Sequence, residues 1–119
     1  MSETTRDIRL RVTSDASGVK AIRWEAEDAP EPGERTAEAM LLALWDGEQR
    51  SAMRIDLWTQ RMTVEDMNDF YFQTLLTLAD TYGRANADPE LAAEIKLFAR
   101  DFADKASKRE RRRTGEKRT

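Results

Sequence analysis

The spacing of the apolar residues changes at Thr63, and this change limits the possible folds more than any other feature of the chain. Before Thr63, apolar and polar residues alternate over short segments, which is typical of strands with one buried face. After Thr63, apolar residues recur every three or four positions, which is typical of amphipathic helices. The sequence therefore predicts a strand half followed by a helical half.

Four segments of the first half are predicted strands: residues 8–13, 22–26, 37–45 and 52–58. The turn-like residues 14–18 join the first two into an antiparallel hairpin, and Asp46-Gly47 lies in the loop of a second hairpin. Two prolines and a glycine make residues 27–35 an exposed loop. A helix from Thr36 to Trp45 stays open as an alternative to the third strand, because Ala, Met and Leu favour helices.

Two helices are predicted in the second half. Thr63 is expected to cap the first helix, with Glu65 and Asp66 at the positive end of its dipole, and Gly83 is expected to end it. Asp88-Pro89-Glu90 marks the start of the second helix, whose apolar stripe stops at Phe102.

These elements predict an α+β fold with two layers and the order ββββαα. A four-stranded, mainly antiparallel sheet would be covered on one face by the two C-terminal helices. At 119 residues the chain is long enough for one domain, which we place at residues 1–104. Residues 105–119 form a basic tail with eight basic and two acidic side chains, either an extension of the last helix or disordered.

Cysteine and histidine are both absent, so thiol nucleophiles, imidazole bases and Cys/His zinc sites are excluded. We therefore expect a non-enzymatic protein, without catalytic, cofactor-binding or metal-binding residues. Glu65, Asp66 and Asp69 cluster near a helix start, where acids are favoured electrostatically, and this explanation outweighs a metal site. No apolar segment approaches the ~20 residues of a membrane-spanning helix, and no signal peptide precedes the first strand, so a cytoplasmic location is expected.

A possible interaction surface lies on the second predicted hairpin. If Met53, Ile55 and Leu57 face the helices, the alternate residues of the hairpin lie on the opposite, uncovered face. The predicted interface consists of Leu41, Trp45, Arg54, Asp56 and Trp58. Exposed apolar and aromatic patches of this kind mark interfaces, although Trp45 pointing into the core is the alternative.

Two other kinds of binding are weaker hypotheses. The tail has a cluster of cations that would contact a polyanion such as nucleic acid or an anionic membrane: Lys108, Arg109, Arg111, Arg112 and Arg113. The tail has no aromatic residue for base stacking, and the acidic body opposes such binding, so a solvated terminus is favoured. A small-ligand pocket lined by Trp24, Tyr71 and Tyr82 is the other hypothesis.

Several segments, in this order, resemble one known family. They are Trp24-Glu25-Ala26, Leu44-Trp45-Asp46, Arg54-Ile55-Asp56-Leu57-Trp58-Thr59, Met62, Val64, Met67, Gln73-Thr74-Leu75 and Ala79-Asp80-Thr81. The chain from about Ile8 to Asp104 thereby resembles the gliding-motility-associated GldC family of bacteria, whereas the Arg-rich end departs from it. The resemblance implies a small cytoplasmic protein accessory to the gliding motility and secretion machinery, with no known enzymatic activity. We therefore expect a protein partner, which includes a second copy of the chain in a homo-oligomer, and at most a peripheral membrane contact.

Overall fold

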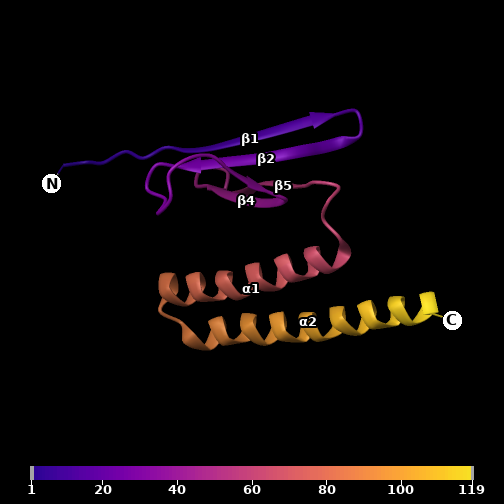
Figure 1. The fold of residues 1–119 in the computed structure, drawn as a ribbon. Coiled ribbons are helices and arrows are strands. Elements are labelled where there is room, and N and C mark those ends of the chain that lie inside the picture. The colour runs from indigo at the N-terminus through magenta and orange to yellow at the C-terminus, as the bar shows by residue number, and fades with distance from the viewer. Residues whose placement is uncertain (1, 119) are drawn as a thin grey trace. The chain divides into compact units, whose positions relative to one another are not determined.

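The structure of the protein is a computed structural model that describes residues 2–118, with side chains described through Thr114. Its elements are β1 (Ile8–Asp15), β2 (Gly18–Ala26), β3 (Arg35–Ala37), β4 (Ala39–Asp46), β5 (Ser51–Trp58), α1 (Val64–Asn86) and α2 (Pro89–Arg118) (Figure 1). The α+β class is therefore confirmed. The chain divides into two compact units, Met1–Met62 and Thr63–Thr119, which we call the strand unit and the helical unit. Cover of a sheet by the helices and a single domain over residues 1–104 stay predictions, and Met1 and Thr119 lie outside the described residues.

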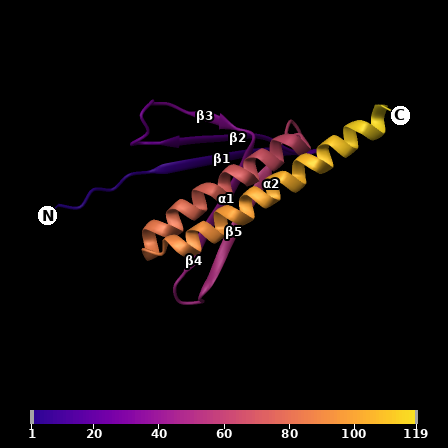
Figure 2. The ribbon, with the colours of Figure 1, turned by 90° about the horizontal axis from the view of Figure 1, so that it is seen from below.

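The predicted first hairpin is confirmed. β1 and β2 pair antiparallel, with Val12 opposite Ile22, and the short strand β3 adds to the other edge of β2 (Figure 2). Ile22, in the middle strand, is only 1% exposed and is the largest apolar side chain that is fully buried in the described structure. The alternating residues of β1 are not buried as predicted, because Ile8 and Val12 both remain exposed.

The predicted single sheet of four strands is wrong in detail, because the structure has two sheets. One contains β1, β2 and β3, and the other contains β4 and β5 alone. The predicted strand at residues 37–45 is interrupted at Glu38, so that Ala37 ends β3 and Ala39 begins β4. The Glu38 carbonyl accepts a hydrogen bond from the Thr59 amide at 2.9 Å, which ties this residue to the chain after β5. The strand assignment of β4 is confirmed, and the helical alternative for this segment is excluded.

The predicted helix starts are confirmed, whereas one predicted helix end is wrong. Thr63 accepts a hydrogen bond from the Asp66 amide at 3.0 Å, and the Asp66 carboxylate accepts one from the Thr63 amide, which completes a capping box. The helix α1 does not end at Gly83 but continues to Asn86 and closes with Ala87 in the left-handed conformation. The second helix, α2, starts at Pro89 as predicted.

Small residues form the contact between α1 and α2, which run side by side in both views (Figures 1 and 2). Ala79, Ala92 and Ala99 are buried along this contact. A Cβ at Gly83 would lie 3.2 Å from the Ala92 Cβ. Gly83 therefore permits the close packing of α1 and α2 and does not end the helix. The basic region from residue 105 onward continues α2 as far as Arg118.

Candidate functional site

The register of β4 and β5 brings the five predicted interface residues onto one face of their hairpin. Leu41 lies opposite Asp56, and the residues opposite Trp45 and Trp58 are both alanines. Because side chains two positions apart share a face, the set continues along both strands. We call it the tryptophan face: Leu41, Trp45, Arg54, Asp56 and Trp58.

Both tryptophans of this face lie mainly in contact with solvent. Trp45 is 63% exposed and Trp58 is 57% exposed, so the alternative in which Trp45 points into the core is excluded. The guanidinium of Arg50 lies over the Trp45 ring at 5.9 Å from the ring centre, within the range of a cation–π interaction. The two ends of the tryptophan face are thus aromatic.

An ion pair occupies the middle of the tryptophan face. The Arg54 Nη2 atom donates to the Asp56 Oδ1 atom at 3.0 Å, and both side chains remain substantially exposed. An exposed pair of this kind adds little to folding stability. It leaves a planar guanidinium between two aromatic anchors, and Trp and Arg are the residue types that dominate binding energy at protein interfaces.

The structure also places Asp56 and Trp58 beside a hollow of the strand unit. This hollow has a volume of about 320 Å³ and is lined as well by the turn between β1 and β2, at Ser17, Gly18 and Val19. No local sequence pattern indicated this hollow, because the residues around Ser17 and those of β5 are far apart along the chain. A side chain of a binding partner can insert into a hollow of this kind beside an exposed tryptophan.

The opposite face of the β4–β5 hairpin is apolar as well. Leu44, Met53 and Ile55 share this face, and all three are at least half exposed. The helices belong to the other unit, so the cover of Met53, Ile55 and Leu57 by helices stays a prediction. The strand unit leaves both faces of this hairpin largely without cover of its own.

A polar cluster next to the tryptophan face was not foreseen. The carboxylate of Glu38 accepts hydrogen bonds from the buried hydroxyl of Thr59 at 2.6 Å and from the Arg61 Nε atom at 2.8 Å. The hydroxyl and the guanidinium lower the pKa of Glu38 below its ordinary value of 4.5. The partners are 21 and 23 residues away from Glu38, a separation at which local sequence patterns carry no signal.

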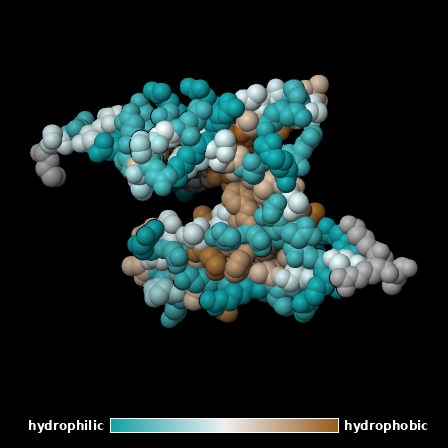
Figure 3. Space-filling view, in the orientation of Figure 1, coloured by the Kyte–Doolittle hydropathy of each residue, from teal (hydrophilic) through white to brown (hydrophobic). Residues whose placement is uncertain are grey.

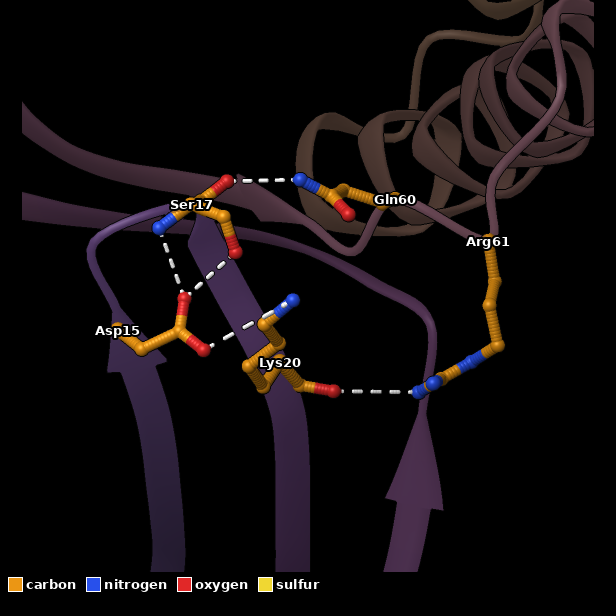
Figure 4. Close-up of polar contacts among 5 residues, drawn as sticks. All are labelled: Asp15, Ser17, Lys20, Gln60 and Arg61. Carbon is orange, nitrogen blue, oxygen red and sulfur yellow. Dashed lines mark hydrogen bonds and ion pairs between the residues drawn. The ribbon is translucent and has the colours of Figure 1, made fainter.

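The same chain segment is fastened to the first hairpin. Gln60 donates a hydrogen bond to the Ser17 carbonyl at 2.7 Å, and the Arg61 Nη2 atom donates one to the Lys20 carbonyl at 3.2 Å (Figure 4). The Asp15 carboxylate accepts hydrogen bonds from Ser17, and these bonds lower the pKa of Asp15. The exit from β5 is therefore held against the β1–β2 turn by bonds to its backbone.

We expect Glu38→Gln to remove a stabilising contribution that depends on pH. Because the folded pKa of Glu38 is lowered, its ionised form stabilises the fold fully above the ordinary value of 4.5 and loses this effect as the pH falls through the lowered value. Urea unfolding at pH 7 and at steps from pH 5 to pH 3 measures the difference between the native chain and the variant. The difference should be largest at pH 7 and shrink in acid.

The matched control is Glu48→Gln, since the Glu48 carboxylate has no hydrogen-bond or ion-pair partner among the described residues. This variant should unfold at nearly the same urea concentration as the native chain at every pH. A Glu38→Gln effect that stays constant or grows in acid would contradict the assignment.

The predicted polyanion-binding residues all lie on α2. The side chains of Lys108, Arg109, Arg111, Arg112 and Arg113 are exposed. Lys108 forms an ion pair with Asp104 at 3.1 Å, and Arg109 and Arg113 line a groove of the helical unit. Polyanion binding stays a prediction, as does the ligand pocket of Trp24, Tyr71 and Tyr82, whose members are divided between the strand unit and the helical unit.

The acidic residues at the start of α1 have a structural role. Asp66 belongs to the capping box, and the described residues contain no group of three or more acidic, His or Cys side chains placed to hold a metal ion. Across residues 2–118, no helix combines the length and the apolar character needed to cross a membrane.

The comparison with protein families identifies the chain. The profile described as "Gliding motility-associated protein GldC-like" matches residues 19–108, which is most of the sequence. The chain belongs to the GldC-like family. The match extends from β2 into the basic part of α2, and it includes the whole tryptophan face of this GldC-like chain. The comparisons with curated proteins and with solved structures gave no match.

Proposed function

We propose that this member of the GldC-like family is a non-enzymatic interaction module of the bacterial cytoplasm. It binds a protein component of the gliding motility or secretion machinery through the tryptophan face. The family membership supports a role in a motility-related assembly. The exposure of Trp45 and Trp58 on one face of β4–β5 is the observation that carries the proposal.

Exposed tryptophans have a cost that a binding role explains. Each presents a large apolar ring to water, and burying such a side chain against a partner releases about 25 cal/mol per Å² of apolar surface. The strand unit offers these rings no cover of its own. Brown, apolar residues also lie at the surface of the helical unit (Figure 3). A partner that covers Trp45 and Trp58 would complete the layer that β4 and β5 lack.

The titratable groups support binding rather than acid–base catalysis. The pKa values of Asp15, Glu38 and Asp80 are all lowered, by hydrogen bonds from Ser17, Thr59 and Lys96 respectively. A general acid or base needs a pKa near the pH at which the enzyme operates, and a lowered carboxyl pKa lies further from neutrality. The hydrogen-bonding capacity of these carboxylates is engaged by neighbouring side chains of the fold.

We expect Trp58→Ala to weaken capture of the partner by at least about tenfold, because truncating an aromatic anchor of an interface costs roughly 2 kcal/mol or more. The measurement is a pull-down from native cells with the tagged chain, in which motility and secretion components are quantified by mass spectrometry. Arg54→Glu should also reduce the capture of the same component, since it reverses the charge at the centre of the tryptophan face.

Met53→Ala is the matched control, because Met53 is similarly exposed but lies on the opposite face of the same hairpin. The Met53→Ala variant should capture as much of the partner as the native chain does. Circular dichroism should show the same secondary structure for all three variants. Equal capture by the native chain and by Trp58→Ala would rule out the tryptophan face as the binding surface.

A further inference from the structure

The helical unit carries large apolar side chains on the outside of its two-helix hairpin. Ala79, Ala92 and Ala99 are the buried residues of α1 and α2 in the described structure, and several larger side chains of both helices remain exposed. Five of these are between 41% and 60% exposed: Val64, Tyr71, Leu78, Leu91 and Phe98. We call this set the outer helix face.

The spacing of the outer helix face is that of a helix-packing seam. Val64, Tyr71 and Leu78 are seven residues apart on α1, and Leu91 and Phe98 are seven residues apart on α2. Such residues stay aligned along a helix to within about 20° per heptad. A seam with this period fits the side chains of other helices, by knobs-into-holes packing.

The two seams lie on the same side of the hairpin. Val64 of α1 and Phe98 of α2 line one groove with a volume of about 330 Å³, together with Phe102. Lys105, Arg109 and Arg113 line the same groove with Asp101, which pairs with Lys105 at 2.9 Å, so the groove combines apolar side chains with a net positive charge. Its occupant must therefore offer apolar residues flanked by acids.

The first half of α2 has this composition itself. Residues 89–104 contain four acidic and two basic side chains, whereas residues 105–113 contain six basic and one acidic. Glu94 lies one helical turn after Leu91, the first apolar residue of the α2 seam. A second α2 running in the opposite direction would place its acidic half at the basic groove, and two-fold symmetry would repeat the contact.

We propose that the outer helix face joins two copies of this chain in an antiparallel four-helix bundle. The basic half of each α2 lies beside the acidic half of the other. A parallel arrangement is disfavoured, because it would bring the two basic halves together.

The available surface suffices for such a dimer. Two adjacent helices about 10 Å wide and about 35 Å long present roughly 700 Å² per copy, or about 1400 Å² in total, within the range of stable interfaces. The proposal places self-association on the helical unit and leaves the tryptophan face free for another protein.

Sedimentation velocity of the full chain over a range of concentrations tests the dimer. We expect the native chain to dimerise and Phe98→Glu to raise the dissociation constant at least tenfold, with unchanged helicity by circular dichroism. Leu97→Glu is the matched control, since Leu97 is as exposed as Phe98 but points about 100° away around the helix. A native chain that stays monomeric at every concentration, or equal weakening by the two variants, would overturn the proposal.

Charge reversal tests the antiparallel direction. Glu94→Arg should weaken the dimer, as should Arg109→Glu with Arg113→Glu, and the three changes together should restore it. Failure of the combined variant to recover any affinity would overturn the antiparallel arrangement. The result is independent of the proposed function, because Trp58→Ala should still dimerise and Phe98→Glu should still capture the motility partner.

Discussion

The variant Ile22→Ala is expected to lose about 2–5 kcal/mol of unfolding free energy, the range measured when a fully buried large aliphatic side chain is truncated. Ile22 lies in β2, the middle strand of the three-stranded sheet, and only 1% of it is exposed. Its truncation removes apolar contacts and leaves a cavity. Because small domains are stable by only about 5–15 kcal/mol, this loss is a large fraction of the total stability.

Urea unfolding followed by tryptophan fluorescence and circular dichroism measures this loss. Ile8→Ala makes the same chemical change at a position that is 72% exposed, so it should lower the stability by less than about 1 kcal/mol. If the two variants unfolded at the same urea concentration, Ile22 would contribute no more to stability than the exposed Ile8, which would contradict its place in the core.

The second large effect is expected for Gly83→Leu. Its Cβ would lie 3.2 Å from the Ala92 Cβ, closer than an ordinary contact, so the two helices must shift apart to admit the side chain. Overpacking of this kind costs about 1–3 kcal/mol. Replacing a helical glycine gains at most about 1 kcal/mol of helix propensity, so a net loss remains.

Thermal unfolding followed by the helical signal at 222 nm measures the loss. Ala85→Leu is the matched control, because Ala85 lies in the same turn of α1 but is exposed. It should shift the stability by no more than about 0.5 kcal/mol. Unchanged melting of Gly83→Leu would show that α1 and α2 do not approach each other closely at this point.

The sequence predicted the features that depend on neighbouring residues. The capping box at Thr63 and the start of α2 at Pro89 rest on side chains within one helical turn. The tryptophan face was also predictable, because a period of two places alternate residues of β4 and β5 on one side once they pair.

The features that the sequence did not predict depend on distant residues. One predicted strand is divided at Glu38 because its two parts pair with different strands, Ala37 with Ile22 of β2 and Ala39 with Trp58 of β5. The local sequence around Gly83 predicts the end of a helix, but in the structure Gly83 permits close contact with Ala92 on the next helix. The hollow beside Trp58 likewise needs the β1–β2 turn, which no local pattern places there.

The isolation of the β4–β5 pair has a consequence for the life of the protein in a cell. Two-stranded hairpins are only marginally ordered in water by themselves. This pair has no third strand in its sheet among the described residues, and large apolar side chains are exposed on both of its faces. Its order is therefore coupled to the presence of whatever covers it. Under the proposed function, copies without the partner would leave this pair more open to proteases.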